Sequence, residues 1–422
     1  MTPSQQSAEE PPVLPTGPRV DPYPMYAEMR ERTVVQHVKE PNGLERWLIL
    51  NYEQARDAFT DERLSKDPKK AYEKLRSAGY VTSDKDDKAD YLYHLLNTDP
   101  PDHTRLRRLV GKAFTMRRVE ALRPRVEEIA DGLIDRIAAR GSADLVEDFS
   151  HPLSVAVICD MLGVPAERRS DFRVWATAML TAPDQVDENT MGPQEGYALM
   201  REFFTALLAE KRAALGEADG AAAQPDVLSG LIAARDAEDR LSETELISTA
   251  MLLLSAGQEP TVNLINNGML ALFTHPGQME LLRDKPELLV TAVDEFLRYD
   301  PPVELSTMRV AVEDVEIAGT VIPAGSVVTA AIASAHRDPA EFDRPDELDV
   351  TRAHNPHLAF GHGIHHCVGA PLARLEGQVA VGALLRRLPD IALGCPAGEL
   401  TWRPTRIMRG LTALPVVFTP QT

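Results

Sequence analysis

The chain has 422 residues, of which 44% are hydrophobic and 26% charged, a composition typical of a globular protein that can bury a large core. Its 45 basic and 64 acidic residues give a net charge of −19, which argues against binding to nucleic acid or to an anionic membrane surface. The first twenty residues are polar and proline-rich, and no later segment reaches the ~18 uninterrupted apolar residues of a spanning helix, so we expect a cytoplasmic protein.

The predicted elements follow an N-terminal arm, residues 1–22, whose polar and proline-rich sequence predicts loose order. Residues 24–32 have helical spacing, residues 46–50 alternate as in a strand, and residues 52–59 return to helical spacing. Residues 64–101 are charged and weakly periodic, and such a long segment without a strong element is more often functional or mobile than filler.

The clearest helix begins at Ser242, after a stretch with mostly helical spacing. Glu245 stands three residues after this serine, which is the signature of a capping box. The helix runs to Thr274, where His275-Pro276 ends it, so its ~32 residues span about 48 Å. Because it is apolar on most faces, it is expected to cross the interior of the protein.

Shorter elements follow in the last third of the chain. A helix is predicted from Pro286, a favoured first position, to just before Pro301. Three short strands separated by glycine-containing turns are predicted at residues 315–317, 320–322 and 327–330. The sequence therefore predicts a mainly α fold with small β-sheets, in a single domain over residues 23–422.

A glycine-rich segment precedes one last helix, residues 370–385, and reads Phe360-Gly361-His362-Gly363-Ile364-His365-His366-Cys367-Val368-Gly369. Three glycines within nine residues allow a tight loop whose backbone lies close to something flat or bulky. Cys367 then stands near a helix N-terminus, where the helix dipole and free amide groups favour a thiolate. A thiolate so placed is suited to be the axial ligand of a haem iron.

The cysteines have competing interpretations. Cys159 and Cys395 are expected to be structural, and three cysteines form no disulfide framework, which fits a reducing compartment. A zinc site is the alternative at Cys367, because three histidines stand beside it. Zinc sites usually draw ligand pairs from separated segments, however, and no second Cys/His pair has a suitable spacing. Haem ligation is the favoured prediction.

The pattern Phe-Gly-x-Gly-x-His-x-Cys-x-Gly matches the cytochrome P-450 signature at every fixed position, and the chain resembles this family from about residue 21 to residue 418. The resemblance is greatest to soluble bacterial members, such as the biosynthetic and xenobiotic enzymes of actinomycetes, which take electrons from a ferredoxin. It implies haem b between the long helix and the cysteine helix, with Cys367 on the iron and with Phe360, Gly361 and Gly369 in the cofactor loop.

Other marks of the family occur in the right order along the chain. Glu295 and Arg298 look like its Glu-x-x-Arg pair, and at i, i+3 they share one helical face. The resemblance completes this pair with Arg352 as a structural ion cluster. Its implied role is in folding and haem retention.

His103 and Arg107 stand at i, i+4, so both lie on one helical face where they can grip an anion. The family places such a pair on a haem propionate, together with residues corresponding to Arg309 and His365. Four such groups would offset the cost of burying two carboxylates, which is otherwise several kcal/mol each.

The long helix departs from the family pattern in Ser255-Ala256-Gly257-Gln258-Glu259-Pro260-Thr261. Relatives usually read Ala-Gly-x-acid-Thr, and the threonine helps to deliver protons in oxygen activation. Pro260 takes that place; it has no hydroxyl and no N–H, although it can keep the helix bend. Glu259 remains as the acidic partner, and Thr261 is displaced by about 100° around the helix. The candidate catalytic residues are Ala256, Gly257, Glu259, Pro260 and Thr261.

Two hypotheses follow for the reaction. In the first, oxygen activation persists through Glu259, ordered water, Thr261 or a substrate hydroxyl, and the enzyme is a monooxygenase acting on a hydrophobic or natural-product-like small molecule. In the second, a haem-thiolate oxidase couples or cyclises its substrate through C–C, C–N or C–O bonds without inserting oxygen. A haem sensor without turnover is a third class, which Glu259 and the substrate-enclosing segments disfavour.

The resemblance also implies two surfaces. Candidate substrate contacts, for which core packing is the alternative, are Met179, Leu180, Leu252, Val303, Leu305, Met308, Ile407 and Met408. A local basic cluster is either a solvated helix face or the docking face for an acidic ferredoxin, and it consists of Arg105, Arg108, Lys112, Arg117 and Arg118.

Overall fold

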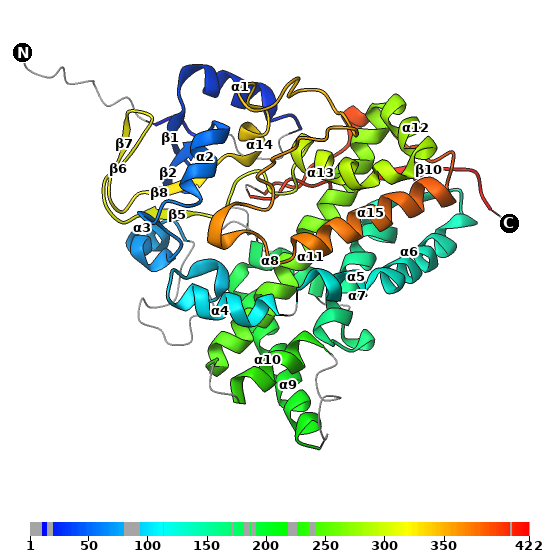
Figure 1. The fold of residues 1–422 in the computed structure, drawn as a ribbon, viewed down its shortest axis with the longest axis horizontal. Helices are drawn as coiled ribbons and strands as arrows, with labels where there is room; N and C mark the ends of the chain where they lie inside the picture. Colours follow the sequence, from blue (N-terminus) through cyan, green and yellow to red (C-terminus); the bar gives the residue numbers. More distant parts are fainter. Residues whose placement is uncertain are drawn as a thin grey trace, which may run out of the picture.

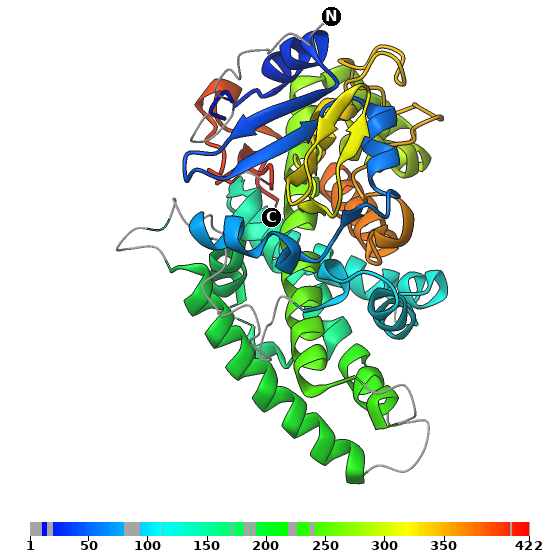
Figure 2. The same cartoon turned by 90° about the vertical axis from the view of Figure 1, so that its left-hand side faces the viewer.

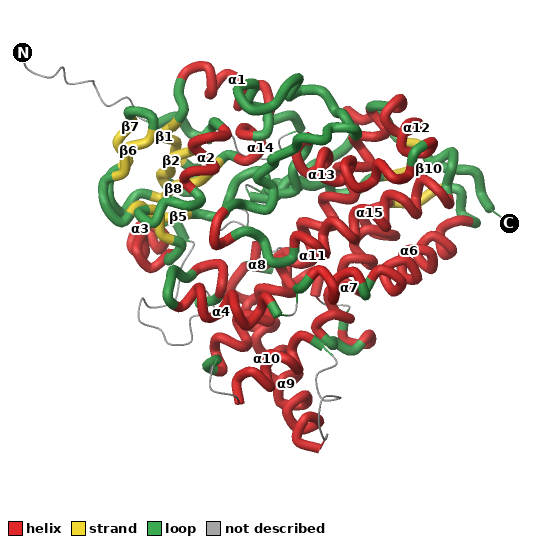
Figure 3. The backbone as a smooth tube through the Cα atoms, in the orientation of Figure 1, coloured by secondary structure: helices red, strands yellow, loops and turns green. Residues whose placement is uncertain are grey.

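The computed structural model describes residues 11–14, 20–79, 93–112, 114–169, 172–180, 186, 191–217, 226–236, 241–405 and 407–421. Helices make up most of these residues, and the strands gather mainly at one corner (Figure 3). The predicted class, mainly α with small β-sheets, is confirmed.

The helices and strands have the following bounds. The α-helices are α1 Tyr23–Arg32, α2 Tyr52–Ala58, α3 Tyr72–Ser77, α4 Asp102–Gly111, α5 Met116–Glu120, α6 Arg123–Ala138, α7 His151–Leu162, α8 Phe172–Leu180, α9 Pro193–Glu217, α10 Val227–Asp236, α11 Glu243–Thr274, α12 Pro276–Asp284, α13 Leu289–Tyr299, α14 Ile332–Ala335 and α15 Ala370–Arg387. The strands are β1 Val35–Lys39, β2 Glu45–Ile49, β3 Leu64–Ser65, β4 Ser142–Asp144, β5 Arg309–Ala311, β6 Val315–Ile317, β7 Thr320–Ile322, β8 Val327–Ala330, β9 Ala392–Leu393 and β10 Pro415–Val417.

The largest sheet has the strand order β1-β2-β8-β5-β3, with β2 and β8 parallel and the other neighbours antiparallel. A second sheet has the order β4-β10-β9, and β6 and β7 form a hairpin. The large sheet occupies one corner of a roughly triangular molecule, and helices α9 and α10 form the opposite tip (Figure 1).

In two N-terminal segments, the residues that the structure describes are more ordered than the sequence pattern indicates. The arm was expected to be loosely ordered, but Leu14 is buried and its N–H donates to the carbonyl of Lys39 on β1 at 2.9 Å. Residues 64–101 were expected to have no strong element, yet they contain β3 and α3. Both differences arise from pairing with distant segments, which a local pattern does not record: Leu64 of β3, for example, pairs with Ala311 of β5.

The long helix is present as predicted, with its capping box at Ser242 and its end at Thr274. The Ser242 hydroxyl accepts from the N–H of Glu245 at 3.1 Å, and the Glu245 carboxylate accepts from the N–H of Ser242 at 2.7 Å. Figure 2 shows α11 running lengthwise through the middle of the molecule. The predicted helix at Pro286 begins with a 3-10 turn, Pro286–Leu288, before α13.

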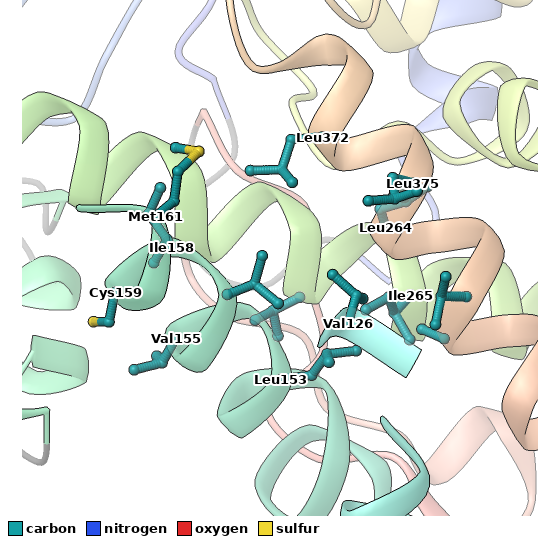
Figure 4. Close-up of a cluster of buried hydrophobic side chains, with 14 of the residues drawn as sticks. Val126, Leu153, Val155, Ile158, Cys159, Met161, Leu264, Ile265, Leu372 and Leu375 are labelled. Atoms are coloured by element: carbon teal, nitrogen blue, oxygen red, sulfur yellow. The ribbon is translucent and has the colours of Figure 1, made fainter. Parts of the chain in front are cut away.

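The core lies where α7 and α15 pack against α11 (Figure 4). At Gly257 an added Cβ would lie 2.8 Å from Cδ1 of Ile158 on α7, and at Gly377 of α15 it would lie 3.2 Å from a methyl group of Leu264. These two glycines therefore let α11 approach both neighbours closely. The cysteine loop immediately precedes α15, so this packing fixes its position beside α11.

Among the residues that the structure describes, no helix is both long and apolar enough to cross a membrane.

Candidate active site

One strip of α11 remains accessible although most of this helix is buried. Ala256 is exposed, and Leu252, Gly257 and Pro260 are half-buried, between neighbours that are buried. Leu252, Ala256 and Pro260 follow one another at a spacing of four, so they share one face of the helix. The accessible face of α11 is therefore apolar and includes the residue that distinguishes this sequence, Pro260.

The cysteine loop is shaped by glycines with positive φ. Gly361 and Gly363 have φ of +69° and +72°, and an added Cβ at Gly363 would lie 2.7 Å from a methyl group of Thr60. The N–H of Cys367 donates to the carbonyl of Phe360 at 2.8 Å and closes the loop. Cys367 is exposed, but many protein atoms surround its thiol. Because they displace water, they raise the pKa of the thiol. The N–H groups of Gly369 and Ala370 and the Arg107 cation act in the opposite direction and lower this pKa.

Buried cationic and donor groups meet on one side of this loop. The rings of His103 and His365 lie 4.1 Å apart, and neither ring nitrogen of His103, nor Nε2 of His365, has a hydrogen-bond partner among the described residues. Arg309 is 8% exposed and donates to the carbonyls of Leu64 and Phe59, both at 2.9 Å. Burial lowers the pKa of Arg309 to about 10.

Lys66, which no pattern in the sequence indicates, is a further member of this cluster. It is 4% exposed, and its ammonium donates to Thr307 Oγ1 at 2.7 Å and to the carbonyl of Met308 at 2.8 Å. Burial lowers the pKa of Lys66 well below its usual value, and the nearby Arg309 cation lowers it further. Orphaned donors beside buried cations suit an anionic ligand, so the residues present fit the propionates of a haem.

The structure brings Glu295, Arg298 and Arg352 together. Arg298 binds both carboxylate oxygens of Glu295, at 2.8 and 2.7 Å, and Arg352 Nε binds Glu295 Oε2 at 3.1 Å. The side chains of Glu295 and Arg298 are 0% exposed. Arg298 also donates to three carbonyls between residues 336 and 347, so the cluster ties α13 to the long connection that leads to the cysteine loop.

A second network, not predicted from the sequence, continues toward the cysteine. Asp294 accepts from Arg374 Nε at 2.7 Å and lies 3.1 Å from His357 Nε2. The guanidinium of Arg374 stacks over the ring of Phe360 at 4.6 Å. Because the carbonyl of Phe360 accepts the N–H of Cys367, this network helps to fix the position of the cysteine loop.

The comparisons with known proteins agree with this geometry. The profile of the family described as Cytochrome P450 matches residues 194–389. Over 420 residues the chain is 45% identical to the cytochrome P450 monooxygenase PikC of Streptomyces venezuelae, covering 98% of this chain and 96% of that protein. The chain belongs to the cytochrome P450 family.

Two solved cytochrome P450 structures are similar throughout. The myxobacterial CYP267B1 in complex with myristic acid has a TM-score of 0.87 at 39% identity, covering 96% of this chain and 98% of that one. CxnD, an enzyme for C–S bond formation in chuangxinmycin biosynthesis, has a TM-score of 0.85 at 38% identity, covering 98% and 100%. The cofactor of a cytochrome P450 is haem with a cysteine thiolate on the iron, and Cys367 is the cysteine in the signature loop.

In this cytochrome P450, the candidate catalytic residues Glu259 and Thr261 are both buried and bonded to other groups of the protein. Glu259 is 4% exposed and is held by Arg403, whose Nη1 donates to its Oε1 at 2.8 Å. The Thr261 hydroxyl donates back to the carbonyl of Gly257 at 3.3 Å, and Thr261 is also buried. The accessible strip thus presents Ala256 and Pro260, and Thr261 is not turned onto it. Arg403 lies 144 residues from Glu259, so no local pattern in the sequence indicates this ion pair.

The predicted substrate contacts divide into two groups. Leu305 is 1% exposed and packs with Leu14 and Tyr26, as the core-packing alternative expects. The side chain of Leu180 lies outside the described residues. The partly accessible candidates are Met179, Leu252, Val303, Met308, Ile407 and Met408.

The predicted basic cluster also changes. Arg105 binds the Glu245 carboxylate, with Nη1 at 3.3 Å from Oε2, so it belongs to the capping of α11 and not to an open surface. The exposed members, all on or beside α4 and α5, are Arg108, Lys112, Arg117 and Arg118. Arg107 of α4 donates to the carbonyl of His366 at 2.6 Å, which puts this surface next to the cysteine loop.

Proposed function

We propose that this cytochrome P450 is a cytoplasmic monooxygenase that inserts one oxygen atom from O2 into a hydrophobic, natural-product-like small molecule, with electrons from a ferredoxin. The observation that carries the proposal is the apolar accessible strip of α11, with Leu252, Ala256 and Pro260 on one face. Partly accessible apolar side chains from three other segments suit a bulky apolar substrate. The identity of PikC as a monooxygenase supports the reaction type.

We further propose that His103, Arg107, Arg309, His365 and the additional cation Lys66 hold the haem propionates. Haem with a thiolate ligand supplies the oxygen-activating chemistry when bound. The protein contributes the seat for its carboxylates, the loop that presents Cys367 and an apolar face that excludes water.

A second candidate is a coupling or cyclising oxidase that inserts no oxygen. Pro260 favours it, because the usual threonine hydroxyl is missing, and CxnD, a structure similar to this chain, forms a C–S bond. Turnover under 18O2 separates the two reactions. The monooxygenase proposal predicts one 18O atom in each product molecule, whereas product that is free of 18O and has lost hydrogen would establish the alternative.

Replacing Pro260 with threonine is expected to raise the fraction of consumed electrons that appears in product. The substitution places a hydroxyl on the accessible strip, and a positioned proton donor typically contributes at least about 100-fold, so a severalfold change is readily reached. The measurement is product formed per NADH oxidised, with a substrate identified by its spectral shift.

Thr261→Val is the matched control, because it removes a buried hydroxyl that bonds back to the helix. It should leave this ratio unchanged. If P260T has no effect while T261V lowers the ratio, Thr261 is the proton donor and Pro260 does not tune oxygen activation.

Reversing the charge at Arg108 is expected to slow reduction by the ferredoxin on the order of tenfold at low salt, since charge complementarity raises association rates. Lys112→Glu should act in the same direction, and added salt should shrink both differences. Stopped-flow reduction rates test this. Arg136→Glu, an equal charge change on an exposed position of α6, is the control, and equal slowing in that variant would refute a docking face at α4.

A further inference from the structure

A hairpin, described at residues 401–405 and 407–412, lies at one end of the accessible strip. Trp402 and Leu411 form an antiparallel bridge, and the N–H of Arg403 donates to the carbonyl of Gly410 at 2.9 Å. The turn between them carries Ile407 and Met408, which are partly exposed. Met408 forms a bridge with Val303, so the turn and the segment after α13 form one continuous surface.

A row of buried polar residues on α11 faces this hairpin. Glu259, Asn263 and Asn267 follow one another at a spacing of four and are between 2% and 4% exposed. Glu259 binds Arg403. Asn267 Nδ2 donates to the carbonyl of Arg409 at 3.0 Å, and Asn263 lies so close to Gly410 that a Cβ there would be 2.0 Å from its Oδ1.

This polar row continues the accessible strip along the helix. At 100° per residue, Asn263 lies within about 20° of Ala256 around α11, and Asn267 lies equally close on the other side. The face of the helix that is accessible at Ala256 is therefore covered by the hairpin about two to three turns later. Arg403 binds Glu259, one residue before Pro260.

We propose that the Glu259–Arg403 ion pair fastens this hairpin to α11, and that Arg403 is a positioning residue which sets the shape of the substrate wall made by Ile407 and Met408. The proposal rests on the proposed function in that these two residues contact substrate. It assigns Glu259 to anchoring rather than to proton transfer, because its carboxylate is buried and its Oε1 is 2.8 Å from the guanidinium. Substrate size selection would then depend on an ion pair beside the oxygen-activating site.

The test uses the haem protein and two probes of different size. Imidazole binds haem iron without reaching far from it, whereas the phenyl ring of 4-phenylimidazole reaches further into the substrate pocket. We expect Arg403→Gln and Glu259→Gln to weaken 4-phenylimidazole binding by a similar factor, on the order of tenfold, with imidazole binding unchanged. The double variant should be no weaker than either single one, since both substitutions break the same contact.

Gly410→Ala gives an independent test, because it leaves both charges in place and displaces the hairpin by contact with Asn263. It should weaken 4-phenylimidazole binding as the charge variants do. Arg403→Lys keeps a positive charge, so it should weaken this binding less than Arg403→Gln does. Native-like 4-phenylimidazole binding in the double variant, which leaves no buried charge unpaired, would overturn the proposal.

A larger loss of product per NADH in E259Q than in R403Q would also overturn it and would assign Glu259 to proton transfer. Failure of the proposed function is distinguishable, because it would appear as product free of 18O from the unaltered protein, whereas failure of this proposal would appear in the binding of the two probes to the variants.

Discussion

Cys367→Ala is expected to abolish the thiolate-type, red-shifted absorption band of the reduced, carbon-monoxide-treated protein, and with it all oxygenation. The substitution removes the sulfur that stands at the N-terminus of α15, where two backbone N–H groups and the Arg107 cation favour the thiolate. A replacement ligand from the neighbouring histidines would give an unshifted band. The measurement is the difference spectrum with and without carbon monoxide.

Cys395→Ala is the matched control. Cys395 lies outside the signature loop and packs at the edge of the core, so its removal should leave the spectrum and the turnover unchanged. If the red-shifted band survived in C367A and disappeared in C395A, the assignment of the thiolate to Cys367 would be wrong, and Cys395 would be the iron ligand at another haem site.

The parts of this molecule that the sequence predicted well are those determined by local chemistry. The capping box at Ser242 requires two side chains three residues apart, and the hairpin at residues 315–322 requires one turn. Both were located to the residue because every interaction that defines them is close in sequence. The same holds for the cysteine loop, whose glycines are needed within nine residues.

What the sequence did not predict is determined by contacts between distant segments. The pattern gave no reason to pair Arg403 with Glu259, or Lys66 with Thr307 and Met308. Arg105 is a related case. The basic residues on and after α4 suggested an exposed surface, but the fold places Arg105 against the Glu245 carboxylate. A charge in a sequence indicates a need for a partner or for solvent, and the tertiary fold decides between them.

The buried cluster at Glu295 is expected to give the largest loss of stability of any single charge removal considered. Glu295→Gln leaves Arg298 and Arg352 without their carboxylate, and breaking a buried pair typically costs about 3–5 kcal/mol. Because Arg298 also holds three carbonyls of the connection to the cysteine loop, haem should be lost along with stability. Denaturant unfolding and the haem-to-protein ratio after purification measure the two effects.

Glu347→Gln is a close control for that variant, because Glu347 pairs with Arg344 at the same i, i+3 spacing but with both side chains more than half exposed. Water already solvates these two charges, so the unfolding transition and haem content should stay unchanged. Equal effects in E295Q and E347Q would mean that burial contributes nothing to the cluster. A stable E295Q protein that still loses haem would separate haem retention from folding. The role of Glu295 would then be only to position the cysteine loop.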